Sequence, residues 1–368
     1  MPKTSVGVFR IATAGPGDVS GLMDLIGSGA IDPNSILAIL GKTEGNGGVN
    51  DFTREYAVAA LCTALAPKLS VSPEAVEQRI AFVMSGGTEG VLSPHITVFT
   101  RSEAARPGPS GKRLGIGMAH TRDFLPEELG RSAQITETAK AVQAAMTDAG
   151  ISDPADVHFV QIKCPLLTSE RVAAANARGN KTATTSAYSS MAYSRGASAL
   201  GVAVALGEIG SDLGDDDVLR RYDLFSKVAS TSSGIELMHN VVIVLGNSAS
   251  SASEYVIGHA VMEDAIDAAA VVSALSSVGL SAAPQTAAGR TLVNIFAKAE
   301  ASPDGAVRGF RHTMLEDTDI SATRHARAAV GGLIAGLAGT GAVYVSGGAE
   351  HQGPAGGGPV AVIARLSE

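Results

Sequence analysis

The sequence has no tryptophan and only two cysteines among its 368 residues, and 17% of its residues are charged. Cys62 and Cys164 are too few for a disulfide framework or a cysteine-ligated metal site, and they fit the reduced thiols of a cytosolic protein. The net charge of -8 lacks the basic excess that a nucleic-acid or anionic-membrane partner requires. We therefore expect a small-molecule ligand, no nucleic acid and no membrane.

We expect neither a targeting segment nor a membrane-spanning segment in this sequence. Residues 1–18 hold no apolar core long enough for export. Residues 328–349 carry no charge but are interrupted by seven glycines, which predicts a helix, a loop and a buried strand rather than a membrane span. A cytoplasmic location is the expectation.

One short motif, Ser-x-Gly-x-Glu, occurs three times. The copies lie at 85–89, 232–236 and 346–350, and each follows a run of apolar or small residues. Such a context is typical of a strand that ends in a tight turn, where glycine lets the backbone approach a ligand closely. Three copies in one chain indicate an internal repeat.

The segments around the motif recur as well. Apolar runs predict strands at 6–11, 35–40, 80–84, 95–100, 114–119, 157–162, 241–245, 255–262, 292–297 and 360–365. Helical spacing predicts helices at 18–28, 50–69, 132–148 and 268–275, and two more that begin at about 191 and at 324. We predict an α/β fold of three homologous units, residues 1–104, 112–250 and 255–368, with a polar linker at 101–112.

A lysine, an arginine and the motif serine follow one another in every unit. The three sets are Lys42, Arg54 and Ser85; Lys163, Arg195 and Ser232; and Lys298, Arg324 and Ser346. Taken singly, each is more often a solvated surface group. An arginine in the first turn of a helix opposes the helix dipole, however, and its threefold recurrence indicates that it is kept to bind something.

The chemistry of these residues points to acyl transfer. A serine nucleophile needs a base, and no histidine recurs with the pattern, so the base would be a lysine made neutral by burial and by nearby cations. Backbone N–H groups of the glycine turn are candidate oxyanion donors. The residues predict a Ser-Lys dyad that acts on a cyclic imide or ureide, because such a ring repeats its carbonyl and N–H groups. They do not distinguish the three pairs.

Two other patterns are less specific. Gly41-Lys42-Thr43 resembles the end of a P-loop, but Ile36 stands where that motif needs glycine. The glycine-rich stretch at 351–359 could wrap a hard cation with its carbonyl groups, or could equally be a flexible loop.

Longer stretches resemble the ring-opening amidohydrolase family, which comprises cyanuric acid hydrolases and barbiturases. The stretches are ILGKTEGNGGVNDFTR, FVMSGGTEGVLSPHITVF, DVHFVQIKCPLL, SMAYSRGASALGVA and YVSGGAEHQGPAGGGPVAVIAR. The resemblance covers the whole chain and is nearer to the cyanuric acid hydrolases. It implies three units around a pseudo-threefold axis with a central barrel-like strand core, and a cytoplasmic homotetramer.

The resemblance also implies residue roles. It makes Ser232 the nucleophile and Lys163 its base; Ser233, which stands where the other copies have glycine, is the adjacent hydroxyl. It implies a substrate site of Lys42, Arg54, Ser85, Gly86, Arg195, Ser233, Lys298, Arg324, Ser346 and Gly347. No organic cofactor is implied. A structural divalent cation, magnesium or calcium, is implied at Glu300, Ala349, Gln352, Gly353, Pro354 and Gly357.

The implied reaction is the hydrolytic opening of cyanuric acid to carboxybiuret, which loses carbon dioxide to give biuret. One alternative is a barbiturase, which opens barbituric acid to ureidomalonate. Another is a sensor protein that binds a ureide in a threefold pocket without cleaving it.

Overall fold

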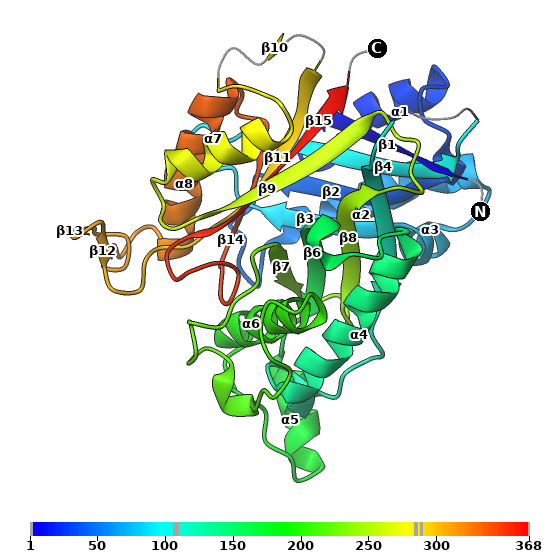
Figure 1. The fold of residues 1–368 in the computed structure, drawn as a ribbon. Helices are drawn as coiled ribbons and strands as arrows, with labels where there is room; N and C mark the ends of the chain where they lie inside the picture. The colour runs from blue at the N-terminus through cyan, green and yellow to red at the C-terminus, as the bar shows by residue number, and fades with distance from the viewer. Residues whose placement is uncertain (1–2, 106–109, 283–285, 288–289, 367–368) are drawn as a thin grey trace.

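The computed structural model describes residues 3–105, 110–282, 286–287 and 290–366. Its strands form three mixed sheets, with helices packed on the outside, so the predicted α/β class is confirmed. In Figure 1 the helices α4, α5 and α6 lie below the strands, α7 and α8 lie at the upper left, and α1 lies at the upper right. Each group of helices comes from a different third of the chain.

The three sheets share one strand order. In each, the first strand of the unit is followed across the sheet by the last, the second and the third. The first sheet contains β1 (Thr4–Ala12), β4 (His95–Glu103), β2 (Ile36–Thr43) and β3 (Ala81–Gly86). The second contains β5 (Arg113–His120), β8 (Val241–Ser248), β6 (Val157–Pro165) and β7 (Ala229–Gly234). The third contains β9 (Tyr255–Met262), β15 (Gly358–Leu366), β11 (Arg290–Ala299) and β14 (Tyr344–Gly347), with β10 (Thr286–Ala287) beside β11.

The pairing within the sheets is also alike. The last strand runs antiparallel to both neighbours, and the second and third strands run parallel to each other. A register shift interrupts the second strand at Ile36/Ala38, Val157/Phe159 and Leu292/Asn294, six residues before Lys42, Lys163 and Lys298 in turn. A bulge bends a strand locally. The same bend therefore precedes each of the three lysines.

Eight α-helices are described. They are α1 (Ser20–Gly27), α2 (Phe52–Leu69), α3 (Pro73–Arg79), α4 (Ser132–Asp148), α5 (Ser169–Ala177), α6 (Ala187–Ala205), α7 (Ala268–Ser277) and α8 (Ala322–Ala338). A side-chain cap begins α2, where Asp51 accepts from the N–H of Thr53 at 3.1 Å. Short 3-10 turns at Pro33–Ser35 and Pro154–Asp156 lead into β2 and β6, and each follows an aspartate that caps it. The matching 3-10 turns before β2 and β6 support the likeness of the first two units.

Three sequence expectations need correction. Helix α5 was not predicted, because its polar stretch has little apolar periodicity. Helix α6 begins at Ala187, four residues earlier than expected, because Ser186 caps it by accepting from the N–H of Ser189. Strand β4 runs to Glu103, paired throughout with β1, so the first residues of the predicted linker at 101–112 are strand. Residues 106–109 of that linker lie outside the described residues.

The central core lies between the inner faces of the three sheets. It buries Val8, Leu40 and Phe99 from the first sheet, Phe159 and Leu245 from the second, and Ile257, Phe296 and Tyr344 from the third. Phe296 is in ring contact with Phe99, Phe159 and Tyr344. We expected a barrel-like strand core. The described strands form separate sheets around this core and no closed barrel, because the edges of neighbouring sheets are not joined by continuous ladders.

A short hairpin, β12 (Ala306–Val307) and β13 (Phe310–Arg311), projects from the body beside α8 (Figure 1). Helices long and apolar enough to cross a membrane are not found among the described residues.

Candidate functional site

Each predicted lysine lies directly beside its predicted serine. The register of the parallel strands pairs Lys42 with Ser85, Lys163 with Ser232 and Lys298 with Ser346. All six side chains are buried. Parallel neighbours in a sheet point to the same face, so the ladder itself brings each base candidate to its nucleophile candidate.

The three serines converge on one pocket of about 30 Å³. The hydroxyl oxygens of Ser232 and Ser346 are 3.3 Å apart, although the residues lie 114 positions apart in the chain. Three arginines and several small or flexible residues complete the lining: Arg54, Arg195, Arg327, Gly47, Met84, Gly86, Met191, Ser233 and Gly347. The pocket therefore presents hydroxyl and guanidinium groups from all three units.

The arginine of the third unit in this pocket is Arg327, not the predicted Arg324. Both lie in the first two turns of α8 and contact Glu89, but the side chain of Arg327 is 3% exposed and that of Arg324 is 43% exposed. Arg324 lies one turn nearer the helix start and is the more exposed of the two. A sequence signal was available, because a large apolar residue follows at i+7 from Arg54 (Leu61), Arg195 (Val202) and Arg327 (Ile334), whereas Gly331 follows Arg324.

The position of Arg195 in its helix also differs from the expectation. It lies in the third turn of α6, because that helix begins at Ala187. The helix dipole therefore does not oppose it as it opposes Arg54, which lies in the first turn of α2. Of the three pocket arginines, only Arg54 therefore lies in the first turn of a helix, where the helix dipole opposes its charge.

The motif glutamates hold two of the pocket arginines. Glu350 accepts from Nε and Nη2 of Arg195 at 2.8 and 2.5 Å, and Glu89 accepts from the same atoms of Arg327 at 2.8 and 2.6 Å. Such bidentate pairs fix a guanidinium in direction as well as in place. Sequence reasoning noted these glutamates but assigned them no role.

The turn glycines leave room for these pairs. Gly87 and Gly348 have φ values of 107° and 74°, in the region that favours glycine. A Cβ atom on Gly87 would lie 2.5 Å from Arg327, and one on Gly348 would lie 2.7 Å from Arg195. The glycines of the motif therefore serve the arginine contacts.

The second unit is arranged differently. Glu236 binds Lys163, with 2.7 Å between Oε1 and Nζ, instead of an arginine. Arg54 consequently donates to backbone oxygens, at 2.6 Å to Gly48 and 3.2 Å to Ser233. Gly234 lies within β7 and does not adopt a positive φ.

The other two lysines bind their serines. Nζ of Lys42 lies 3.1 Å from Oγ of Ser85, and Nζ of Lys298 lies 3.3 Å from Oγ of Ser346. Burial, followed by the charge of Arg327, lowers the pKa of Lys42 well below its ordinary value. Burial and Arg195 lower the pKa of Lys298 to about 7. In both lysines burial therefore favours the neutral amine relative to an exposed lysine.

Glu300, one of the predicted cation ligands, lies beside the loop that contains the others, because the N–H of Ala349 hydrogen-bonds to its carboxyl group. Burial and the neighbouring Glu350 raise the pKa of Glu300 to about 8, and the positive charges of Arg195 and Lys298 offset them only in part. The loop of Ala349, Gln352, Gly353, Pro354 and Gly357 adds backbone carbonyl groups. This donor set fits a hard divalent cation.

Two details bear on that fit. The side-chain oxygen of Gln352 accepts from the N–H of Thr231 at 2.7 Å, so the amide ties the loop to the strand that carries Ser232. The described residues contain no cluster of three or more histidine, cysteine, aspartate or glutamate ligands. A cation here would depend on one carboxylate and on carbonyl oxygens.

The chain belongs to a hydrolase family. A family model described as amidohydrolase ring-opening protein matches residues 7–365. The cyanuric acid amidohydrolase of Bradyrhizobium diazoefficiens is 86% identical over the full length of both chains. The cyanuric acid amidohydrolase of Pseudomonas sp. strain ADP is 60% identical, over 98% of this chain and 99% of the other.

Solved structures give the same result. A cyanuric acid hydrolase structure, described in terms of evolutionary innovation by structural concatenation, matches with a TM-score of 0.94 at 59% identity, over 99% of this chain and all of the other. The hydrolase from A. caulinodans matches with a TM-score of 0.90 at 52% identity, again over 99% and 100%.

Proposed function

We propose that this protein opens cyanuric acid by hydrolysis to carboxybiuret, which loses carbon dioxide to give biuret. The observation that carries the proposal is the full-length, 86% identity to a cyanuric acid amidohydrolase. The pocket supports it, because serine and arginine side chains from three sides suit a ring that repeats one carbonyl and one N–H group around its edge.

The proposed nucleophile is Ser232, and its base is Lys163. Oγ attacks a ring carbonyl carbon while its proton passes to the lysine amine, and the carbonyl π electrons move to the oxygen. The C–N bond then breaks as the lysine proton passes to the leaving nitrogen, which leaves an acyl-enzyme. Water hydrolyses the ester and restores the serine. Backbone N–H groups at the end of β7 are the proposed oxyanion donors.

The remaining pocket groups would bind and polarise the ring. Ser85 and Ser346, with Lys42 and Lys298, would contact the carbonyl groups that do not react, beside the turn positions Gly86, Gly347 and Ser233. We assign the third arginine position to Arg327, next to Arg54 and Arg195, and give Arg324 the outer contact to Glu89. The common strand order and the common bulge support three homologous units around a pseudo-threefold axis.

We further propose a structural divalent cation at Glu300 and the loop of residues 349–357. When bound, it would supply positive charge to a carboxylate that is buried beside another carboxylate. The chain's own residues there, above all Gln352, hold the loop against β7. A cytoplasmic homotetramer remains part of the proposal.

One assay tests the activity. The purified protein is incubated separately with cyanuric acid and with barbituric acid, and the products are identified by mass spectrometry. We expect biuret from the first incubation. Ureidomalonate from the second without biuret from the first would make the protein a barbiturase. Calorimetric binding of a ring without turnover of either would make it a ureide-binding protein.

A further inference from the structure

The second Ser-Lys pair differs from the others in what its lysine touches. Lys42 and Lys298 donate to their serine hydroxyls, whereas Lys163 is bound by a carboxylate oxygen of Glu236 at 2.7 Å. The glutamates at the same motif position in the other copies, Glu89 and Glu350, bind arginines. The chain thus breaks the likeness of its three units at the lysine that we propose as the base.

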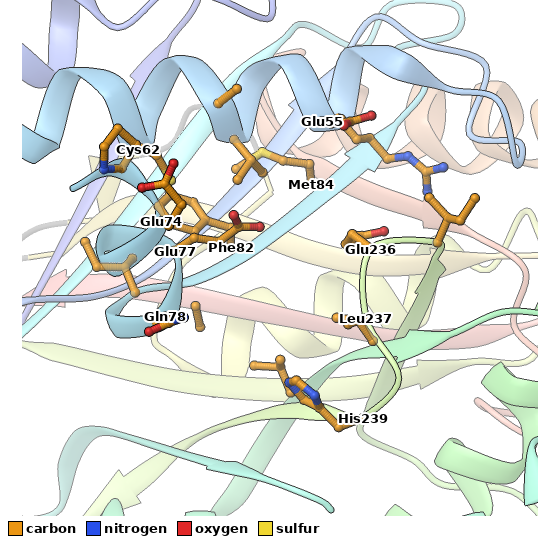
Figure 2. Close-up of a pocket in the computed structure, with 18 of the residues that line it drawn as sticks. Glu55, Cys62, Glu74, Glu77, Gln78, Phe82, Met84, Glu236, Leu237 and His239 are labelled. Carbon is orange, nitrogen blue, oxygen red and sulfur yellow. The ribbon is translucent and has the colours of Figure 1, made fainter. Parts of the chain in front are cut away.

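Glu236 also differs in its access to solvent. Its side chain is 43% exposed, against 11% for Glu89 and 10% for Glu350, while Lys163 is 2% exposed. The glutamate lines a groove of about 1080 Å³ between the first and second units. Figure 2 shows Glu236 in this groove with Leu237 and His239 from the segment after β7, and with Glu55 and Cys62 from α2.

The groove adjoins the central pocket. Arg54 and Met84 line both cavities, so they form part of the wall between them. Lys163 is the ladder partner of Ser232 in the central pocket, and Glu236, which binds it, lines the groove. The carboxylate therefore lies between the buried amino group of Lys163 and the surface groove.

We propose that Glu236 is a positioning residue of the second pair, which holds Nζ of Lys163 and takes up the proton that this lysine must release before it can receive the proton of Ser232. This role rests on the proposed function. It also supplies a reason, independent of family resemblance, for the second pair to act differently from the other two.

The protons balance in the following way. The proposed cycle starts from the ion pair of Lys163 and Glu236. One proton moves from Nζ to Oε1, which leaves a neutral amine and a carboxylic acid. The amine then receives the Ser232 proton as the Oγ–C bond forms and gives it to the leaving ring nitrogen as the C–N bond breaks. After hydrolysis the carboxylic acid returns its proton to Lys163 or to water in the groove.

Other charged groups face this pair. Burial alone would raise the pKa of Glu236, but Lys163, followed by Arg54, favours the ionised carboxylate, and the pKa is lowered overall. From α5, Nη2 of Arg171 donates to the carbonyl oxygen of Ile235, next to Glu236. The groove adds further titratable side chains: Glu55, Glu74, Glu77, His120 and His239. Cys164, beside Lys163 on β6, is buried, and burial raises the pKa of its thiol.

The test compares pH profiles of the full-length protein with cyanuric acid. In the proposed pair the proton of Lys163 passes to Glu236, so the wild-type pair can act until the carboxylate itself is protonated. Without this carboxylate, only a lysine that has already lost its proton to solvent can act as the base. We therefore expect Glu236→Gln to move the acid limb of kcat/KM to higher pH, and to lower kcat at pH 7 by about tenfold or more with a smaller change in KM. Ionisation of the substrate contributes equally to every variant and cancels in the comparison.

Two variants complete the experiment. Glu55→Gln removes a carboxylate from the same groove and is expected to keep the wild-type profile. Glu236→Asp keeps the charge and is expected to hold the acid limb at the wild-type position while kcat recovers in part. A Glu236→Gln limb at the wild-type pH, or an equal shift in Glu236→Asp, would overturn the role of Glu236. Wild-type protein without turnover of cyanuric acid would instead overturn the proposed function, and this role with it.

Discussion

The first and third Ser-Lys pairs keep the lysine on its serine, whereas the second gives the lysine to a glutamate. All three stand on the same frame, because the strand order, the bulge and the register of lysine against serine are common to the three sheets. The difference teaches that a repeated backbone fixes which residues are neighbours, whereas the contacts of each lysine depend on the side chains around it. One acidic side chain is enough to give one of the three pairs a different set of contacts.

The largest test of this difference is removal of the serine hydroxyls one at a time. We expect Ser232→Ala to lower kcat by more than about 10³-fold, as loss of a nucleophile does. Ser85→Ala and Ser346→Ala should each weaken substrate binding by about tenfold, which is the free energy of roughly one hydrogen bond to the ring. Steady-state kinetics on cyanuric acid measures all three. Similar residual kcat values in the three variants would contradict the assignment of Ser232.

The next test separates the two arginines of α8. Arg327→Ala leaves the carboxylate of Glu89 without its bidentate partner, and loss of one member of such a buried pair costs about 3 kcal/mol or more of unfolding free energy. Arg324→Ala removes an exposed contact to the same carboxylate and should cost less than about 1 kcal/mol. Urea unfolding monitored by circular dichroism measures both. Equal losses of unfolding free energy in the two variants would contradict the assignment of Arg327, rather than Arg324, as the main partner of Glu89.

Much of the frame could be predicted from the residues. Apolar runs located the strands that carry Lys42, Lys163 and Lys298, and the Ser-x-Gly-x-Glu motif located the strand ends that carry the serines. Whether the barrel-like core closes could not be predicted in this way, because apolar runs do not report which strand edges are paired. Helix α5 escaped because it buries only Val172 and Ala175, too few positions for a recognisable apolar period, and because its start depends on Thr168, whose side chain accepts from the N–H of Arg171.

The site was predicted less completely than its frame. Spacing selected Arg324 because it stands nearest the helix start, whereas the pocket receives Arg327, one turn further on. Glu236 could not be distinguished from Glu89 and Glu350, because all three occupy one motif position and their partners come from other segments of the chain. Contacts of this kind depend on how the three sheets are set against one another.

A third test concerns the third unit alone, which carries Glu300 and the loop of residues 349–357. Removal of a bound divalent cation with a chelator should lower the unfolding temperature, since a ligand present at 100 times its Kd stabilises a protein by about 2.7 kcal/mol. Differential scanning calorimetry with and without added magnesium or calcium measures the shift. Glu300→Gln should abolish the response. A chelator effect that persists in Glu300→Gln would locate the cation elsewhere.

The smallest expected effect lies between the second and third sheets, where His158 of β6 meets His259 of β9 with 2.8 Å between their Nδ1 atoms. Burial, followed by His158, lowers the pKa of His259 to about 4, and burial also lowers the pKa of His158. The unfolded chain binds protons near pH 6.5, so between pH 6.5 and 4 it binds more protons than the folded protein. The contribution of His259 to the unfolding free energy is therefore fully present above pH 6.5 and decreases as the pH falls toward 4.

We expect His259 to account for a loss of about 2 kcal/mol of unfolding free energy between pH 7 and pH 5. Urea unfolding at the two pH values measures it, His259→Gln should reduce the loss, and an unchanged loss in that variant would place the acid sensitivity at another site.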